Sequence, residues 1–501
     1  MRRIFSSPIT ALVFGLCLRL LFVLRFPASS GDTVLYDQMA TNWLKHGVYA
    51  MDVAGAVQPV DLRMPGYPAY LALVYWLTGK TGEAAQSWVL LGQALVDLLG
   101  CVAIAGLAAL LLPAENRGKK PRAVFVSALW LAALCPFTAN YASVPLTEVF
   151  AVLLTATALL LFVLLLRSHA ASRGIKAPVN LRGLPAEMPA WLLVSLPGFV
   201  VGLATLFRPE SPILLAAGMA MLLCIVAREA GWIASVRTVI LMACAFLLPL
   251  APWAIRNYIT LHEVQLLAPK NSNLPGELVP YGFMAWEKTW LFRVKDCYLV
   301  PWKLNGEAIQ LKDIPERAFD TPEEKQRVAG LLEQYNEDLT LSPEEDAAFG
   351  RLARERTSRH PLRTYVWLPL LRGATMWFTP RIELLPVSGH VFPLKTMWQD
   401  DAVDQSVTIG LFMVNLFYVA LGVWGAVRLW RESPPSRAAL ALLVLYMAAR
   451  TAFLTTLETP EPRYVLECFP ALIAMGAFVF APRRSPAPAR QPSALAAFMS
   501  R

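Results

Sequence analysis

Charged residues that could carry chemistry recur at one end of the hydrophobic segments of this chain. Asp32 directly follows the first of these segments, and Glu148 stands at the start of a later one. Four arginines occupy comparable positions: Arg63, Arg208, Arg256 and Arg463. A guanidinium group binds two phosphate oxygens at once, so arginines and carboxylates gathered at a membrane boundary suit an anionic lipid headgroup. Each arginine alone is more often an anchor at the membrane surface, and the prediction depends on the group.

Asp32 belongs to the first polar stretch of any length, residues 30–43. One face of this stretch is apolar, at Tyr36, Ala40 and Trp43. Spacings of four and three residues predict a short helix that lies on the membrane surface. Asp32 could be the N-cap of a helix that begins at Thr33, and the sequence leaves the capping role and a chemical role equally open. Asp37 lies on another face and is expected to be a solvated acid.

The composition predicts a helical membrane protein. The chain has 501 residues, of which 56% are apolar and 16% charged, and its mean hydropathy is +0.47. Soluble domains carry about 25% charged residues. Ten apolar runs are long enough to cross a bilayer: 8–26, 84–112, 122–140, 146–166, 190–207, 210–227, 235–256, 405–430, 437–457 and 464–481. We therefore expect an all-α polytopic integral membrane protein with about ten transmembrane helices, or up to 13 if shorter segments also cross.

Alternate loops between these runs are rich in Lys and Arg and poor in acids. They are residues 113–122, 167–189, 228–237 and 428–437, and both ends of the chain are also basic. Basic loops stay in the cytoplasm, so the net charge of +9 reflects topology, and no nucleic-acid partner is expected. We expect a protein of a bacterial inner membrane with a retained N-terminal anchor and both termini in the cytoplasm.

Two further apolar segments, 65–79 and 363–378, are expected to lie at the outer surface instead of crossing. Both are short and contain proline, and Arg372 interrupts the second. A crossing at 65–79 would place every later basic loop on the outer side. The Pro-Gly-Tyr-Pro string at 65–68 then fixes a bend at the membrane boundary, which could be simply a stiff turn.

These assignments divide the chain into a membrane module, an external region and a second membrane part. The module covers 1–256 and includes the external loop 27–83, while the last helices cover 405–481 and a disordered tail follows from 482. The external region 257–404 is too long for a simple connection and is expected to fold. Within it, Thr-Pro-Glu-Glu at 321–324 and Ser-Pro-Glu-Glu at 342–345 each predict the start of a helix.

The seven cysteines indicate neither a disulfide framework nor a metal site. Cys17, Cys101, Cys135, Cys224 and Cys244 lie within apolar segments, and no Cys-x-x-Cys or Cys/His metal spacing occurs. We expect no structural metal.

Taken in order, the short motifs at the outer ends of the apolar runs resemble those of the GT-C membrane glycosyltransferases. The series consists of Asp32 with Tyr36, Arg63-x-Pro-Gly-Tyr67-Pro, Leu-Thr-Glu148, Arg208-Pro, Pro-Trp-x-x-Arg256-Asn257 and Arg463-Tyr464. The nearest groups are the protein O-mannosyltransferases and the lipid A aminoarabinose and galacturonic acid transferases, which are similar to glycosyltransferase family 39. The resemblance covers residues 8–275 best, and the external region 257–404 resembles no domain of the family.

The resemblance implies transfer of one sugar from a polyprenyl-phosphate donor to a hydroxyl of a lipid, glycan or protein acceptor at the periplasmic face, with inversion. Asp32 maps onto the catalytic base of the family. The implied substrate-binding residues are Tyr36, Arg63, Tyr67, Glu148, Arg208, Arg256, Asn257, Arg463 and Tyr464. For the phosphate of the donor, Arg208 is ranked first, then Arg256, Arg463 and Arg63.

One departure from the family concerns the second acid. Many relatives carry Asp-Glu where this chain has Asp32-Thr33, so any role of a second acid falls to another residue, such as Glu148. No cofactor is implied beyond the lipid-linked donor, and the resemblance leaves open whether the reaction requires a divalent metal ion.

Two other functions compete with this prediction. A lipid or solute transporter would carry charged groups in the middle of the membrane, where Asp97 is the chief candidate. A non-catalytic assembly protein would fit the same apolar composition, although it has no need of Asp32 together with the arginines.

Overall fold

The computed structural model describes residues 7–112, 120–171, 189–271, 273–274, 277–399 and 401–481. Most of the two basic loops predicted at 113–122 and 167–189, and the tail predicted to be disordered after 482, lie outside the described residues. The described chain is almost entirely helical, and its two strands form a single hairpin. The predicted all-α class is confirmed.

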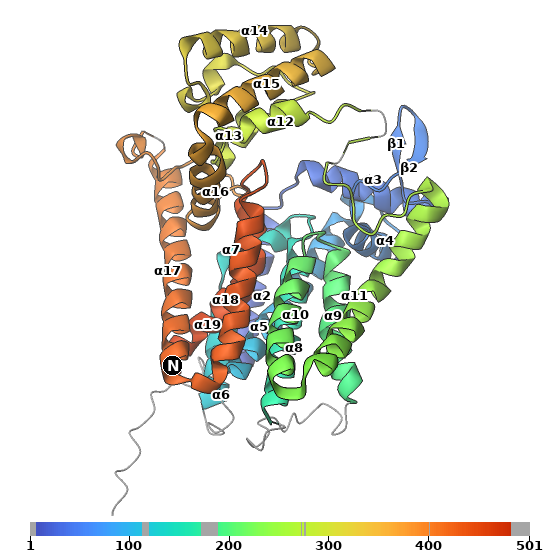
Figure 1. The fold of residues 1–501 in the computed structure, drawn as a ribbon, viewed down its shortest axis with the longest axis vertical. Helices are drawn as coiled ribbons and strands as arrows, with labels where there is room; N and C mark the ends of the chain where they lie inside the picture. Colours follow the sequence, from blue (N-terminus) through green and yellow to red (C-terminus); the bar gives the residue numbers. More distant parts are fainter. Residues whose placement is uncertain are drawn as a thin grey trace, which may run out of the picture.

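Most of the helices form one bundle (Figure 1). Within the described residues, seven segments are long and apolar enough to cross a membrane: α2 (Pro8–Arg25), α5 (Gln86–Leu110), α8 (Glu148–Ala171), α11 (Trp232–Leu261), α17 (Ala402–Glu432), α18 (Arg437–Leu454) and α19 (Phe469–Ala477) with the flanking turns η10 (Pro462–Cys468) and η11 (Phe478–Phe480). Three further apolar segments lie in the bundle. One is bent, and consists of α6 (Lys120–Ala133) followed by α7 (Pro136–Ala139) and η3 (Asn140–Ser143). The other two are the shorter helices α9 (Ala190–Thr205) and α10 (Pro212–Ala230). These segments correspond to the ten predicted apolar runs.

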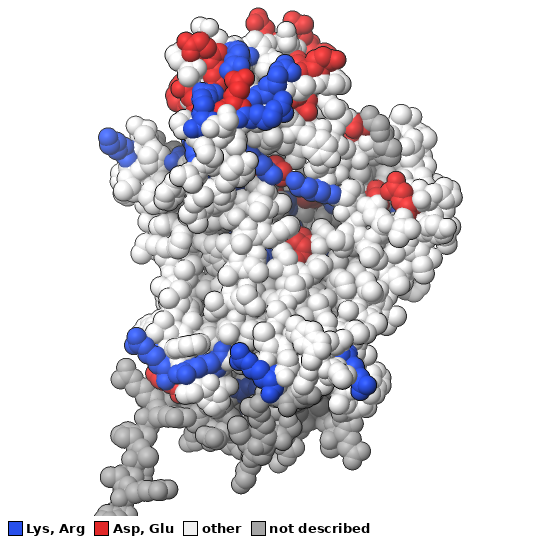
Figure 2. All heavy atoms as spheres, in the orientation of Figure 1, with Lys and Arg blue, Asp and Glu red and all other residues white. Residues whose placement is uncertain are grey.

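Charged side chains on the visible face lie above and below the middle of the bundle. Figure 2 shows a wide band of uncharged side chains, with Lys and Arg along its lower margin and both signs of charge above it. An uncharged band of this kind is typical of a surface in contact with lipid. The site residues described below lie at the upper margin, at the end opposite the basic margin.

The loop after α2 carries two short helices and the hairpin, all near the upper end of the bundle (Figure 1). They are α3 (Gly31–His46), β1 (Ala50–Val53), β2 (Ala56–Pro59), α4 (Gly66–Thr78) and the turn η1 (Gly82–Ala85). Strands β1 and β2 are antiparallel, with Ala50 opposite Pro59. Helix α4 has 13 residues, too few to cross a bilayer, and it packs beside α3. This agrees with the expectation that residues 65–79 belong to the loop and do not cross.

The external region forms a second unit above the bundle (Figure 1). Its elements are α12 (Tyr281–Glu287), α13 (Val294–Leu299), η4 (Pro301–Lys303), η5 (Leu311–Asp313), η6 (Glu316–Ala318), α14 (Pro322–Asp338) and α15 (Pro343–Arg359). Their buried side chains, Phe283, Trp286, Trp290 and Phe349 among them, make a hydrophobic core separate from that of the bundle. Both predicted helix starts are confirmed, because the hydroxyls of Thr321 and Ser342 accept hydrogen bonds from the third residue of their helices.

A short helical stretch connects this unit to the membrane helices. It consists of the π-helical turn η7 (Arg363–Trp367) and α16 (Leu368–Trp377). Two 3-10 turns lie later in the chain and outside this connection: η8 (Leu394–Thr396), before α17, and η9 (Pro434–Ser436), between α17 and α18. Arg372 of α16 is 2% exposed and donates to the carbonyl oxygens of Leu291 (2.9 Å) and Lys288 (2.6 Å). The arginine that interrupts the apolar segment 363–378 therefore ties α16 to the external unit.

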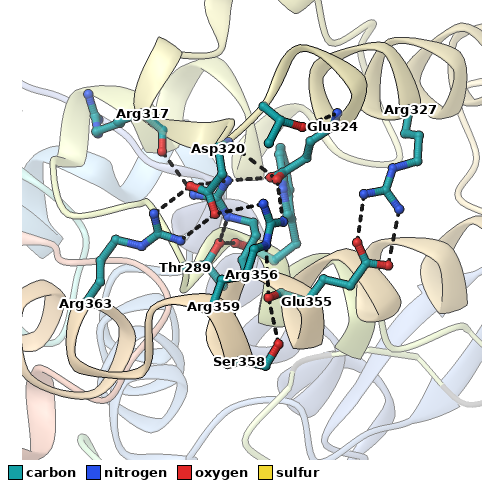
Figure 3. A network of polar contacts seen from close by, with 12 residues as sticks. Thr289, Arg317, Asp320, Glu324, Arg327, Glu355, Arg356, Ser358, Arg359 and Arg363 are labelled. Atoms are coloured by element: carbon teal, nitrogen blue, oxygen red, sulfur yellow. Dashed lines mark hydrogen bonds and ion pairs between the residues drawn. The ribbon is translucent and has the colours of Figure 1, made fainter.

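Buried ion pairs join α14 and α15 (Figure 3). The guanidinium of Arg356 lies against Glu324, and both side chains are fully buried. Arg356 also donates to the hydroxyl of Thr289 at 2.8 Å, while Arg359 pairs with Glu324 at 2.8 Å. Each buried charge thus has hydrogen-bonding partners, which a buried ion pair requires in order to be tolerated.

This network gives a prediction for the stability of the external unit. Arg356→Met should destabilise α14 and α15 by about 3–5 kcal/mol, because it leaves the Glu324 carboxylate buried without its main partner. The matched control is Arg327→Met, which removes an ion pair to Glu355 in which both side chains are about half exposed; such pairs contribute about 0–1 kcal/mol. Hydrogen exchange of the amides in residues 322–359 measures both effects, and equal exchange rates in the two variants would contradict the prediction.

Candidate active site

Asp32 lies in the first turn of α3 and does not cap the helix. The N-cap is Ser30, whose amide donates to the hydroxyl of Thr33 at 3.1 Å. The capping alternative for Asp32 is therefore wrong, and its carboxylate accepts instead from Arg63 at 2.7 Å and from Arg463 at 3.3 Å. Asp37, expected to be a solvated acid, accepts a 2.5 Å hydrogen bond from the hydroxyl of Tyr75 and fastens α3 to α4.

The surroundings of Asp32 keep its carboxylate ionised. Burial alone would raise its pKa, but the positive charges of Arg63, Arg463 and Arg208 together lower the pKa below its usual value. The side chain is 22% exposed, so it is shielded from bulk water without being sealed off. Asp32 thus presents a charged oxygen at neutral pH.

Glu148 links the two arginines deeper in the site. It is the first residue of α8, its side chain is 3% exposed, and one of its oxygens lies 2.5 Å from Arg208 and 3.5 Å from Arg463. Arg208 lies in the tight connection between α9 and α10. Gly66 holds this connection in place: its amide donates to the carbonyl oxygen of Leu206 at 2.7 Å, and a Cβ there would come within 2.6 Å of that oxygen.

A second layer of charges lies behind Arg208, and its Arg450 and Glu467 are not among the residues predicted for the site. Arg450 of α18 is fully buried and pairs with Glu467 at 2.6 Å and with Glu210 at 3.2 Å. Glu467 in turn lies 3.9 Å from Arg208. Both Arg450 and Glu467 sit within runs that were counted only as membrane spans. The signal was present, since an ionisable residue inside a span is a candidate functional residue in its own right.

Two cavities meet at Asp32, Arg63, Arg463 and Tyr464. The first, here called the basic cavity, has a volume of about 560 Å³. Its other charged residues are Arg208, Glu210 and Lys270, so basic residues outnumber acids, and its apolar wall includes Phe207, Ile213, Leu267, Phe453 and Leu457. Figure 2 shows charged side chains gathered around a hollow at the upper margin of the uncharged band. This cavity combines positive charge with an apolar surface.

The second cavity, here called the acidic cavity, lies on the other side of the same four residues. It has a volume of about 670 Å³ and adds two carboxylates, Glu383 and Glu461, to that of Asp32. Acids therefore outnumber the two arginines in its lining. Glu461 is engaged within the site, since it accepts a 2.6 Å hydrogen bond from the hydroxyl of Tyr464 and lies 2.6 Å from Arg463. The two cavities thus differ in charge while sharing Asp32 at their junction.

Seven of the predicted site residues belong to this arrangement. Asp32, Tyr36, Arg63, Arg208, Arg463 and Tyr464 line the cavities, and Glu148 pairs with two of the arginines.

The other three predicted residues do not line the cavities, although the ring of Tyr67 packs edge to face on that of Tyr36. Tyr67 is fully buried, with its hydroxyl 2.5 Å from Gln93. Arg256, ranked second for the phosphate, donates instead to the carbonyl oxygens of Tyr49 (2.5 Å) and Val60 (2.8 Å). Asn257 is fully buried and donates to the carbonyl oxygen of Gln265 at 3.2 Å. The contacts of Arg256 and Asn257 hold the hairpin loop and the end of α11, and that of Tyr67 joins α4 to α5, so none of the three side chains lines either cavity.

The charges in the middle of the bundle do not form a comparable site. Arg19 and Asp97 pair at 2.6 Å and are 0% and 2% exposed. Arg19 also donates to the carbonyl oxygens of Gly15 and Ala133, so its donors are used within the protein. A transporter would need its mid-membrane charges to face a path for solute, whereas this pair binds three helices together. Within the described part of the chain, no group of three His, Cys, Asp or Glu side chains is placed to hold a metal ion.

Comparisons with known proteins yield structural neighbours only. No family model and no curated protein sequence matches the chain. One solved structure similar to it is the archaeal oligosaccharyltransferase AglB from Archaeoglobus fulgidus in complex with an inhibitory peptide and a dolichol-phosphate, with 12% identity over 94% of this chain and a TM-score of 0.45. Another is ArnT from Cupriavidus metallidurans bound to undecaprenyl phosphate, with 14% identity over 94% of this chain and 77% of that one and a TM-score of 0.38.

The chain spans about half the length of the oligosaccharyltransferase, of which 50% is covered. At these identities and TM-scores the likeness concerns the fold at most, and any function for this chain has to come from the residues of its own site.

Proposed function

We propose that this protein is a membrane glycosyltransferase that moves a single sugar from a polyprenyl-phosphate donor to a hydroxyl of an acceptor at the outer face of the membrane. The observation that carries the proposal is the junction of the two cavities at Asp32, with one cavity basic and the other acidic. Such an arrangement gives separate places to an anionic donor and to an acceptor, with a carboxylate between them.

The basic cavity suits a phosphate attached to a lipid. Arg208 and Arg463 supply guanidinium groups that bind phosphate oxygens in pairs, and Lys270 adds a further positive charge. Phe453, in the last turn of α18, and Leu457, just after the helix, offer an apolar surface to the first units of a prenyl chain. Positive charges fixed in a partly dry site also stabilise the negative charge that develops on a departing phosphate.

Asp32 supplies the base for the reaction. The acceptor oxygen attacks C1 of the sugar, the bond from C1 to the phosphate oxygen breaks, and the phosphate leaves with the bonding electrons. The proton of the hydroxyl passes to the Asp32 carboxylate, so no second acid is needed for a leaving group as stable as a phosphate. A single displacement inverts the configuration at C1, whereas a retaining reaction would need a second, nucleophilic carboxylate step.

The test is an assay of purified full-length protein with radiolabelled polyprenyl-phosphate sugars and a membrane extract as the source of acceptors. We expect label to move from the polyprenyl phosphate to an acceptor and free polyprenyl phosphate to be released in equal amount. Facilitated passage of the intact labelled lipid between the leaflets of a vesicle, without cleavage, would instead support a transporter.

The lowered pKa of Asp32 gives a prediction for the dependence on pH. The ionised, basic form persists as pH falls until the lowered pKa is reached, so the acid limb of kcat/KM that belongs to Asp32 should lie at lower pH than for an aspartate with its ordinary pKa. In Arg63→Met the closest positive charge is lost, so the pKa of Asp32 and the acid limb should move to higher pH. Profiles of kcat/KM against pH for both proteins measure the difference. An acid limb that stays in place in the variant would show that Asp32 is not the titrating base.

A further inference from the structure

The acidic cavity contains a carboxylate that the proposed transfer step does not use. Glu383 follows α16 and lines the cavity half-buried. Asp32 and Glu461, the other acids of the lining, are paired with arginines. Among the described residues, none gives the Glu383 side chain an ion pair or a side-chain hydrogen bond. Burial raises the pKa of Glu383 above its usual value, and its carboxyl oxygens can accept hydrogen bonds from hydroxyl groups.

Arg381 anchors the backbone two residues before Glu383. Its guanidinium is 6% exposed and donates to the carbonyl oxygens of Pro462 (2.6 Å) and Met376 (3.1 Å) and to the side chain of Asn415 (3.2 Å). It also lies over the ring of Phe469, at 5.0 Å from the centroid. These hydrogen bonds tie Arg381 to α16, α17 and η10. The backbone at Glu383, two residues further along the chain, is therefore held at the wall of the cavity.

Aromatic rings from the external unit form part of the opposite lining. Tyr298 of α13 and Trp302 of η4 meet edge to face, with their ring centroids 4.4 Å apart. They are 47% and 44% exposed, so each ring keeps a large free surface although both line the cavity. Rings of this kind pack against the C–H faces of sugar rings, and their polar edges donate hydrogen bonds to hydroxyls.

From these contacts we infer that the acidic cavity is a saccharide subsite, in which Glu383 binds hydroxyl groups and Trp302 with Tyr298 packs against a sugar ring. The inference rests on the proposed function, because it makes the acceptor of the transfer a glycan. A volume of about 670 Å³ lies within the range of roughly 300–1,000 Å³ that small-molecule pockets occupy. A peptide acceptor would be expected to find a free strand edge or a row of backbone groups, whereas the lining of this cavity includes three acids and four aromatic residues.

The test is binding, which does not depend on turnover. Full-length protein in lipid nanodiscs, free of sugar-based detergents, is titrated with disaccharides of hexose and of N-acetylhexosamine and with a short serine-containing peptide, and saturation-transfer NMR reports the binding. We expect at least one disaccharide to bind and the peptide not to bind. Glu383→Ala and Trp302→Ala should each weaken the binding at least tenfold, while Glu383→Gln, which keeps hydrogen-bonding capacity, should weaken it less.

Matched controls separate the subsite from general effects of mutation. Glu263→Ala and Trp398→Ala remove the same residue types at exposed positions outside the cavity and should bind as the unaltered protein does. Thermal unfolding midpoints identify any variant that has lost its fold, and Glu383→Gln is the variant expected to disturb the fold least. Binding of the peptide alone, or disaccharide binding that is unchanged in both alanine variants, would overturn the inference.

The outcome also stays distinct from that of the proposed function. If no sugar transfer is found and Glu383-dependent binding persists, the subsite stands and the transferase proposal fails. If transfer is found and Glu383→Ala binds saccharides normally, the transferase stands and the subsite is refuted.

Discussion

Asp32→Asn should leave an inserted and folded protein whose rate of sugar transfer is lower by about 10²–10⁴-fold, the usual contribution of a general base. Asparagine has nearly the same shape and keeps one oxygen that can accept from Arg63 or from Arg463, which donate to different oxygens of Asp32, but it cannot take a proton. The rate of transfer from a labelled polyprenyl-phosphate sugar measures the loss, and gel filtration verifies the fold.

Asp37→Asn is the matched control for this prediction. Asp37 lies one and a half turns further along the same helix and accepts from the hydroxyl of Tyr75, away from both cavities. The same substitution there should change transfer by no more than a few fold. Near-normal turnover by Asp32→Asn, or an equal loss in both variants, would refute the role of Asp32 as base.

Arg208→Gln should have two separate effects, on stability and on binding of the donor. It removes the main partner of the buried Glu148, and such a loss destabilises a protein by about 3–5 kcal/mol. It also removes a charged donor from the basic cavity, where hydrogen bonds to charged groups are worth about 1.5–3 kcal/mol. Binding of a polyprenyl phosphate should therefore weaken by about 10- to 100-fold.

A double variant separates these two effects. Arg208→Gln with Glu148→Gln removes both charges of the pair and should recover part of the stability, while its binding of polyprenyl phosphate stays weak. Arg256→Gln is the matched control, because Arg256 holds the carbonyl oxygens of Tyr49 and Val60 outside the cavities and should be dispensable for the phosphate. Normal phosphate binding by Arg208→Gln, with loss in Arg256→Gln, would contradict the site described here.

The membrane helices could be predicted from the sequence because their signal is local. A bilayer requires about 20 apolar residues in a row, and each of the ten predicted runs corresponds to helical structure in the bundle. The starts of α14 and α15 were equally readable, since the cap, the proline and the acids that make them are consecutive in the chain. The fold class therefore follows from short windows of sequence.

The site depends on contacts that no short window contains. Asp32 meets Arg463 across 431 residues, and nothing local shows that Ser30 caps α3 and leaves the carboxylate of Asp32 for the arginines. Arg256 belongs to the motif series, but its direction is set by the carbonyl groups of the hairpin loop. Glu383 has no sequence signal of its own, because only the fold brings the external region to the outer end of α3.

The position of the donor phosphate tests the central claim most directly. A cryo-electron microscopy structure of the full-length protein in nanodiscs with added polyprenyl phosphate would show it. The proposed function predicts a phosphate within hydrogen-bonding distance of Arg208 and Arg463 in the basic cavity, with its prenyl chain passing Phe453 and Leu457 and Asp32 facing it across the junction. A phosphate bound elsewhere, with the basic cavity occupied by water alone, would contradict the account.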